Sequence, residues 1–299
     1  MPLIFQFNSV VFIMTSLLLV ESGSSKTDWC FISKNQKPVS CQTSGLNPYH
    51  RSEQDCLEAL AKELELNIDK NDEFKIIFYG AGIKDSILSS SIEKILTNLF
   101  GKREIEIHSD ILAAARATCG HEKGMVCILG TGSNSGYYNG KIMESTNPSL
   151  GYIIGDEGSG TYLGKRVLQY YFYNTFDDDL KANFEDKYGN NISEILHKIY
   201  KEPMGNTYLA SFTEFLKENR EHFMVQNIIE DAFIDFHQRH VLKFRQSWKY
   251  PIHFVGSVAY EFKDILLDLQ EQFGLETGKI MKSPLKALID FHHKALAEA

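Results

Sequence analysis

The sequence predicts an α/β protein of two lobes, and three observations support this fold class. The chain has 299 residues, more than a single hydrophobic core usually serves. Apolar runs typical of strands alternate with amphipathic helical stretches, as in a sheet flanked by helices. A strand, a turn of glycine and hydroxyl residues and a second strand occur twice, at 16–32 and again from Met125. We therefore expect an N-terminal lobe over residues 1–118 and a C-terminal lobe over 119–299.

The N-terminal lobe begins with a predicted β-hairpin. Apolar runs at 16–21 and 29–32 flank "SGSSKTD", whose small and hydroxyl residues suit a turn. The next elements are a loop at 43–50, a helix at 52–66 opened by Ser52, a strand at 74–83 ending in a glycine-rich loop, a helix at about 86–99, a strand at 104–110 and an alanine-rich helix from Ile111. This alternation predicts a sheet covered by helices.

The C-terminal lobe repeats the hairpin in "VCILGTGSNSGYYNG". The following "GYIIGDEGSGTYLGKR" is a glycine-punctuated loop that leads into a helix. From about 161 to 249 apolar residues recur mainly at helical spacing, which predicts a helical insertion. The segment "IHFVGSVAYEF" is a further strand, turn and helix. A last helix at 284–298 follows Ser283 and begins with Pro284, both favourable at a helix start, and we expect it to pack back on the N-terminal lobe.

Charge and cysteine content exclude several classes of protein. The net charge is -8 and no block of Lys or Arg is present, so nucleic acid is not an expected partner. The five cysteines are odd in number and form no CxxC pair, which argues against a disulfide framework, a zinc site or a thioredoxin-like motif. They are Cys30, Cys41, Cys56, Cys119 and Cys127. We expect reduced thiols in a cytoplasmic protein.

The apolar run over the first twenty residues raises the question of export. No Lys or Arg precedes the run and polar residues such as Gln6 and Asn8 interrupt it, unlike a signal peptide. The run is also a poor membrane span, so no membrane partner is expected. Met14 offers an alternative start, with residues 1–13 as an extension.

The two turns are the strongest chemical signal. Without Cβ atoms in the way, backbone N–H groups of such a turn converge on one point, which suits phosphate oxygens. One turn alone is a weak signal, because most such turns only reverse the chain. A pair, one from each lobe, clamps a nucleotide as phosphoryl transfer requires. The residues concerned are Gly23, Ser24, Ser25, Lys26 and Thr27 in the first turn and Gly130, Thr131, Gly132 and Ser133 in the second.

Common catalytic motifs are missing from the sequence. Neither turn fits the P-loop pattern, no G-x-G-x-x-G follows the first strand, and no G-x-S-x-G or HExxH occurs. Between Gly155 and Gly158, Asp156 and Glu157 form a solvated turn or a loop whose polar groups fix sugar hydroxyls.

Five ordered motifs resemble the N-acetylglucosamine kinase branch of the BadF/BadG/BcrA/BcrD ATPase family, within the actin/hexokinase/Hsp70 superfamily. They are "ESGSSKTDW", "HSDILAAARA", "ILGTGSNSGYYNG", "GYIIGDEGSGTYLGKR" and "FVGSVAYEF", and the resemblance extends from residue 14 to the end. It implies two ribonuclease-H-like (actin-like ATPase) domains facing an ATP cleft, with Gly256 and Ser257 beside the adenosine. It also implies ATP, Mg²⁺ and an amino sugar, most readily N-acetylglucosamine, as ligands. Related kinases often form homodimers.

The resemblance also implies roles for single residues. Asp110 matches the family's catalytic aspartate, which would accept the proton of the attacking sugar hydroxyl; on residue type alone it is equally a helix cap. Asp156 would bind the sugar, with Glu157 beside it. Glu21 stands where many relatives carry Asp, and would reach Mg²⁺ through water. The remaining sugar contacts of the family match Asn47, Asn134 and Gly151.

Three alternatives stay open at this point. Lys26 either touches phosphate or is a solvated turn lysine. A BadF-type activator, which couples ATP hydrolysis to electron transfer, needs cysteine ligands for an iron–sulfur cluster, and Cys119 and Cys127 are eight residues apart. A sugar-sensing relative that has lost catalysis is the third alternative. The sequence does not separate N-acetylglucosamine from glucosamine, N-acetylmannosamine or muramic sugars.

Overall fold

A computed structural model gives the fold of most of the chain. It describes residues 16–23, 25–33, 36–46, 52–66, 68, 72–83 and 86–298. Residues 1–15, which include Met14, lie outside the described residues. Among the helices within these ranges, none combines the length and the hydropathy of a membrane span.

The N-terminal sheet has five strands in the order β3-β2-β1-β4-β5. They are β1 (Ser16–Ser22), β2 (Lys26–Ser33), β3 (Gln36–Ser44), β4 (Lys75–Gly80) and β5 (Ile105–Ser109). β1 pairs with β2 in an antiparallel hairpin and with β4 in parallel. Helices cover both faces of this sheet, which is why residues 17–20 of β1 are a continuous buried run.

The two faces of β1 serve different helices. Leu18 and Val20 pack in a cluster that includes residues of α1 (Glu53–Glu63) and α2 (Ser86–Phe100). Leu17 and Leu19 pack instead in a cluster with residues of α3 (Asp110–Cys119) and α13 (Leu285–Glu298). The alternation of side chains along a strand produces this division.

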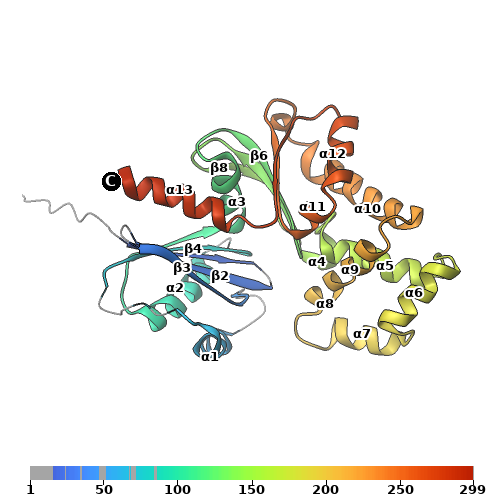
Figure 1. Ribbon diagram of the computed structural model, residues 1–299, viewed down its shortest axis with the longest axis horizontal. Helices are drawn as coiled ribbons and strands as arrows, with labels where there is room; N and C mark the ends of the chain where they lie inside the picture. Colours follow the sequence, from blue (N-terminus) through green and yellow to red (C-terminus); the bar gives the residue numbers. More distant parts are fainter. Residues whose placement is uncertain are drawn as a thin grey trace, which may run out of the picture.

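The C-terminal sheet repeats the same plan, in the order β10-β9-β6-β7-β8. Its strands are β6 (Gly124–Leu129), β7 (Ser133–Tyr138), β8 (Met143–Thr146), β9 (Ile252–Val255) and β10 (Thr277–Met281). Each of its strands corresponds to one strand of the first sheet, with the antiparallel hairpin on one side and the parallel strands on the other. The predicted α/β fold with two similar lobes is therefore confirmed (Figure 1).

The alanine-rich helix α3 lies between the two sheets. Ala113 and Ala117 belong to the cluster that includes Leu17 and Leu19 of the N-terminal sheet. Ala114 and Ala115 pack in another cluster with strands of the C-terminal sheet. Alanines on both faces keep the helix thin, so that both sheets approach it closely.

Helices form most of the segment between β8 and β9. They are α4 (Gly151–Ile154), α5 (Gly160–Phe172), α6 (Asp178–Tyr188), α7 (Ile192–Tyr200), α8 (Gly205–Ser211), α9 (Thr213–Glu218), α10 (Phe223–Phe236), a π-helical turn η1 (His237–Val241) and a 3₁₀ turn η2 (Arg245–Trp248). This region extends away from the C-terminal sheet in Figure 1. Two more helices, α11 (Ser257–Glu261) and α12 (Lys263–Gln272), connect β9 to β10.

The last helix, α13, follows the C-terminal sheet but packs on the other lobe. Its Leu288 is fully buried in the cluster that contains Leu17, Leu19 and Ile77. Figure 1 shows α13 lying along the N-terminal sheet. The chain thus crosses between the lobes twice, once at α3 and once at α13.

Candidate active site

In both lobes, predicted site residues follow the carboxyl ends of parallel strands. In the N-terminal sheet Ser22 pairs with Gly80, and Gly80 with Ser109, so these strands end together. Asp110 comes directly after this edge. In the C-terminal sheet Ile128 pairs with Val255, so Gly130 and Gly256 follow a common edge as well. Ligands of open α/β sheets bind at such edges.

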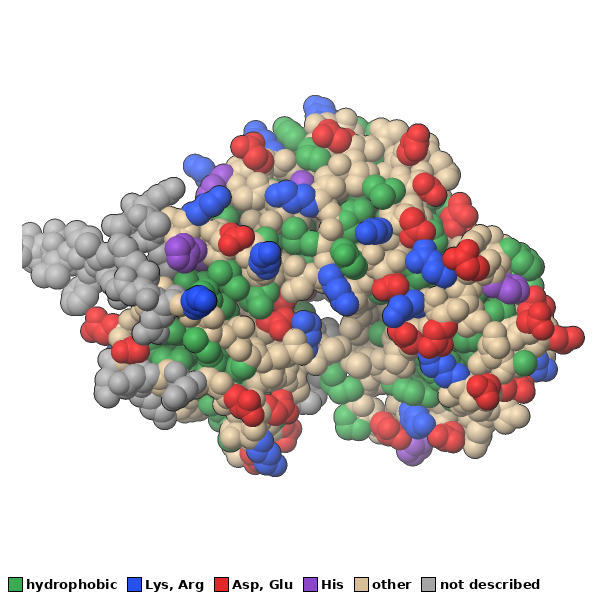
Figure 2. All heavy atoms as spheres, viewed as in Figure 1, with side chains coloured by type: hydrophobic (Ala, Val, Ile, Leu, Met, Phe, Trp, Pro, Cys, Tyr) green, Lys and Arg blue, Asp and Glu red, His purple; other side chains and the backbone are tan. Residues whose placement is uncertain are grey.

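The two glycine-rich turns meet across the space between the lobes. Ser25 Oγ lies 3.1 Å from Thr131 Oγ1 and 3.5 Å from Thr207 Oγ1 of α8. The Gly23 N–H donates to the Lys26 carbonyl at 2.9 Å and closes the first turn. Ser24 lies outside the described residues. The molecule is hollowed between the N-terminal lobe and the helical region (Figure 2).

Two side chains that were predicted to bind phosphate, those of Thr27 and Lys26, already contact polar groups of the N-terminal lobe. The fully buried Thr27 hydroxyl lies 2.8 Å from Ser22 Oγ and donates to the Ser44 carbonyl at 3.1 Å. Lys26 Nζ pairs with Asp28 at 2.9 Å, and the lysine side chain is half exposed. Thr27 therefore fixes the hairpin to β3, and Lys26 is paired in the same lobe.

The second turn is fastened to its surroundings through the backbone. The Gly130 and Thr131 carbonyls accept hydrogen bonds from the Gly160 and Thr161 N–H groups, at 2.8 and 3.1 Å. Gly256, with φ of 131°, has no room for a side chain, because a Cβ there would lie 2.2 Å from the Leu129 carbonyl oxygen. Glycine is needed here for both its conformation and its size. Ser257 begins the next helix, α11.

Three carboxylates gather near the N-terminal sheet edge. Burial and, to a smaller extent, the negative charges of Asp28 and Asp110 together raise the pKa of Glu21 to about 7, against the opposing effect of Lys26. Asp110 is the first residue of α3 and accepts the Ile111 N–H at 2.7 Å. The N-cap position belongs to Ser109, whose side chain makes no capping hydrogen bond, so Asp110 is not the N-cap residue of α3.

The described part of the chain contains no site that would coordinate a metal ion directly. Within it, no group of three His, Cys, Asp or Glu side chains is arranged to hold an ion. The mutual repulsion of Glu21, Asp28 and Asp110 is relieved by a nearby positive charge, so this cluster fits a hydrated cation held through water.

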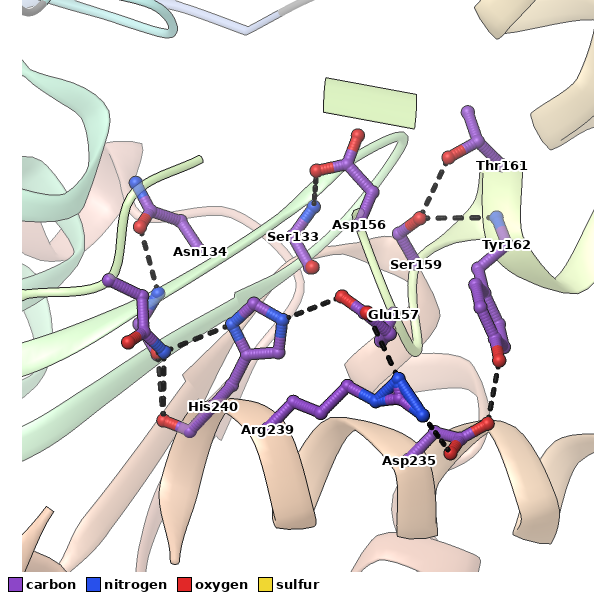
Figure 3. A network of polar contacts seen from close by, with 12 residues as sticks. Ser133, Asn134, Asp156, Glu157, Ser159, Thr161, Tyr162, Asp235, Arg239 and His240 are labelled. Atoms are coloured by element: carbon purple, nitrogen blue, oxygen red, sulfur yellow. Dashed lines mark hydrogen bonds and ion pairs between the residues drawn. The ribbon is translucent and has the colours of Figure 1, made fainter. Parts of the chain in front are cut away.

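The loop after β8 supplies two further acids, with different partners. Asp156 adopts φ of 59° and its Oδ1 accepts the Ser133 N–H at 3.2 Å; burial raises its pKa, although that hydrogen bond opposes the shift. Glu157 accepts from His240 Nε2 at 2.9 Å and pairs with Arg239 at 3.4 Å. Burial alone would raise the pKa of Glu157, but the hydrogen bond from His240 and the interactions with the backbone and with Arg239 outweigh it and lower the pKa. Figure 3 shows both side chains among their partners.

A cavity of about 160 Å³ adjoins this loop. Its lining includes Ser133, Asn147, Asp156, Glu157, Arg239 and His240. Among the described side chains, the Ser133 hydroxyl is one of a few buried polar groups without a hydrogen-bond partner. It therefore offers an unused donor and acceptor at the cavity wall.

The other predicted sugar contacts lie around this loop or outside the described residues. Asn134 is on β7, where its Oδ1 accepts the Ser135 N–H at 2.9 Å. Gly151 begins α4 with φ of 74°. Asn47 lies outside the described residues. Sequence reasoning missed Asn147, Arg239 and His240, since a separation of 83 residues between His240 and Glu157 leaves no spacing signal.

Comparisons with known proteins agree with this architecture. No protein-family model matches the chain. A solved structure of a candidate N-acetylglucosamine kinase from Porphyromonas gingivalis is 34% identical, covers 93% of this chain and 99% of its own, and has a TM-score of 0.86. A candidate N-acetylglucosamine kinase from Chromobacterium violaceum has the same fold, with a TM-score of 0.70 at 14% identity and coverage of 93% and 99%.

A curated relative supports the same relationship over a shorter stretch. The N-acetyl-D-glucosamine kinase of Dictyostelium discoideum is 27% identical over 169 residues, which is 50% of this chain and 52% of the relative. The match thus spans about half the length of the relative. Given the 34% identity to the Porphyromonas gingivalis protein over nearly the whole length of both chains, the protein belongs to the N-acetylglucosamine kinase-like family of actin-fold ATPases.

Proposed function

We propose that the protein is an ATP-dependent amino-sugar kinase that transfers the γ-phosphoryl group of ATP to a hydroxyl of N-acetylglucosamine. The observation that carries this proposal is the 3.1 Å contact between Ser25 and Thr131. It brings the glycine-rich turns of the two lobes together, beside the sheet edge from which Asp110 begins α3. Kinship with N-acetylglucosamine kinases supports the choice of sugar.

In this proposal each side of the cleft has its own task. Backbone N–H groups of the two turns bind the phosphates of ATP, and Gly256 and Ser257 lie beside the adenosine. Asp156 accepts a hydrogen bond from a sugar hydroxyl. Asp110 accepts the proton of the attacking hydroxyl as that oxygen forms its bond to the γ-phosphorus and ADP leaves.

Mg²⁺ fits the acidic edge of the N-terminal lobe. When bound, the ion neutralises charge on the phosphates. Glu21 and Asp110 would hold it through water, because their carboxylates repel each other in its absence. Closure of the lobes would keep water from the γ-phosphate.

The thiols weigh against the activator alternative. Cys127 is fully buried in β6 and Cys119 nearly so in α3, and burial raises the pKa of both. Cluster ligands are thiolates, and these buried positions favour the neutral thiol. Visible absorbance of anaerobically purified protein is the check, and an iron–sulfur spectrum would favour the activator.

A coupled ADP-release assay over a panel of amino sugars tests the proposed function. We expect sugar-dependent turnover, highest with N-acetylglucosamine. Background turnover with every sugar would favour a non-catalytic sugar-binding relative.

Asp110→Asn tests the proton acceptor. We expect kcat to fall by about 10²- to 10⁴-fold, the usual contribution of a general base. Glu106→Gln is the matched control on β5, since Glu106 pairs with Lys75 on the surface, and its kcat should stay near that of the parent. Sugar-dependent turnover near the parent rate in Asp110→Asn would remove Asp110 from the mechanism.

The homodimer, the cytoplasmic location and the lobe boundary at 118 and 119 stay predictions.

A further inference from the structure

His240 joins four separate segments of the C-terminal lobe. Its ring nitrogens lie 2.9 Å from Glu157 Oε2 and 3.1 Å from Asn147 Nδ2. Its backbone carbonyl accepts from Ser135 Oγ of β7 at 2.9 Å. The residue itself is in the π-helical turn η1. One buried residue, through its ring and its backbone carbonyl, therefore links β7, the segment after β8 and the acidic loop to the π-helical turn η1.

The hydrogen bonds define the proton position on this ring. A carboxylate only accepts, so Nε2 carries the hydrogen that Glu157 receives. The Asn147 amide nitrogen also donates to Ser135 Oγ at 2.8 Å, which fixes its orientation and makes Nδ1 of His240 an acceptor. The imidazole ring thus donates to Glu157 and accepts from Asn147 at the same time.

The π-helical turn explains how the ring reaches the cavity. A π-turn adds a residue to the helical path and displaces the side chains that follow, and such turns are frequent at functional sites. His240 stacks on Phe236 of α10, with 4.9 Å between ring centroids and 11° between planes. In Figure 3 its ring points at Glu157, and it lines the same cavity as Asp156 and Ser133.

We propose that His240 is a positioning residue that holds the acidic loop in the geometry that binds the sugar. It acts through Glu157, whose neighbour Asp156 has a strained positive φ and bonds to Ser133 N–H. Strain of this kind persists only where surrounding contacts impose it. The inference rests on the proposed function, because the sugar is the ligand that Asp156 would bind.

The test compares His240→Phe with His237→Phe. Phenylalanine keeps the stacking of residue 240 on Phe236 but removes both ring nitrogens. His237 is in the same turn and is buried, with hydrogen bonds to the Phe233 carbonyl and Gln270, but it does not line the cavity. Both variants lose two side-chain hydrogen bonds in the same helical turn, so the number of bonds lost is matched.

We expect His240→Phe to raise the KM for N-acetylglucosamine by about tenfold or more, the cost of losing a hydrogen bond to a charged group. The kcat and the KM for ATP should stay within about threefold. His237→Phe should lower the unfolding midpoint without changing the sugar KM. His240→Gln, which keeps an N–H donor for Glu157, should recover part of the affinity. Binding of N-acetylglucosamine without ATP, measured by calorimetry, should follow the same order.

The outcomes separate this inference from the proposed function. Wild-type protein that neither binds nor phosphorylates any sugar overturns both. Active wild type together with an unchanged sugar KM in folded His240→Phe overturns the inference alone, as does an equal rise in His237→Phe. If His240→Phe does not fold, Asn147→Ser decides: it removes the amide that faces Nδ1, and an unchanged sugar KM rejects the positioning role.

Discussion

In the N-terminal lobe, Glu21 lies near Asp28 and Asp110, and these like charges together with burial raise its pKa to about 7. In the C-terminal lobe, Glu157 lies against His240 and Arg239, which lower its pKa. The two sheets have the same strand order, yet their acidic residues are balanced in opposite ways. Glu21 is surrounded mainly by like charges, whereas Glu157 lies against donors of its own lobe.

The two turns are fastened by different elements. The first is closed by the hydrogen bond from the Gly23 N–H to the Lys26 carbonyl and is fastened just past β3 by the Gly45 N–H, which donates to the Ser25 carbonyl, whereas the second is held by the start of α5 through Gly130 and Thr131. A fixed, internally balanced loop suits the recognition of neutral hydroxyls, because little has to be reorganised on binding. An unbalanced acidic edge suits a proton acceptor and a cation. Duplication has thus produced two similar frames with different chemistry.

Gly256→Ala tests how far the second turn depends on close backbone packing, and we expect the largest effect on stability here. The new Cβ would lie 2.2 Å from the Leu129 carbonyl oxygen, at φ of 131°. Strain and overpacking together should cost about 3 kcal/mol or more of unfolding free energy. Gly101→Ala in the N-terminal lobe is the control, with φ of 77° but open space, and should cost about 1–2 kcal/mol. Equal losses in urea unfolding would mean that the close approach to Leu129 adds nothing to the cost of the positive φ.

Glu21→Gln and Glu157→Gln should change stability with opposite signs. The folded pKa of Glu21 is raised from 4.5 to about 7, so the native state binds the extra proton between these values and stability falls as pH rises through them. Glu21→Gln removes this loss and should stabilise the fold at pH 8 by on the order of 2 kcal/mol.

For Glu157 the pH dependence of folding stability has the opposite sign. Its folded pKa is lowered, so its charge stabilises the fold above the unfolded value and that stability is lost as pH falls through the folded pKa. Glu157→Gln should therefore be less stable than the parent at pH 8. Urea unfolding at pH 5 and pH 8 measures both effects, and two variants that shift in the same direction at pH 8 would refute the opposite balance of the lobes.

The central strands and the turns were predictable because their signals are local. The buried run of β1 and the glycine-hydroxyl turns follow from neighbouring residues, and the paired hairpins predicted two lobes. The edge strands β3, β8 and β10 were missed, since they are exposed or partly exposed and carry no strong apolar alternation. The segment predicted as a loop at 43–50 starts with the last residues of β3.

The residues of the candidate site also differ in whether a local sequence signal predicts them. Asp110 and Asp156 stand in or beside recognisable motifs, and the carboxyl edges of parallel strands collect such residues by geometry alone. His240 and Asn147 have no motif, because their importance arises from a fold that brings together segments 93 residues apart. Glu157 was predicted beside the sugar, but its carboxylate is turned to His240 and Arg239. No sequence pattern predicts the direction in which the Glu157 carboxylate points.

The contact between Ser25 and Thr131 tests whether the two turns hold each other or are brought together by what binds between them. Both hydroxyls are accessible to water, so a double-mutant cycle of Ser25→Ala and Thr131→Val should give a coupling energy below about 1 kcal/mol in urea unfolding. Thr207→Val, whose hydroxyl lies 3.5 Å from Ser25 Oγ, is the control and should show no measurable coupling to Ser25. With saturating ATP the Ser25 and Thr131 coupling should grow, because a nucleotide bound by both turns makes each depend on the other. A coupling well above 1 kcal/mol without nucleotide would mean that the protein alone fixes the contact between the two turns.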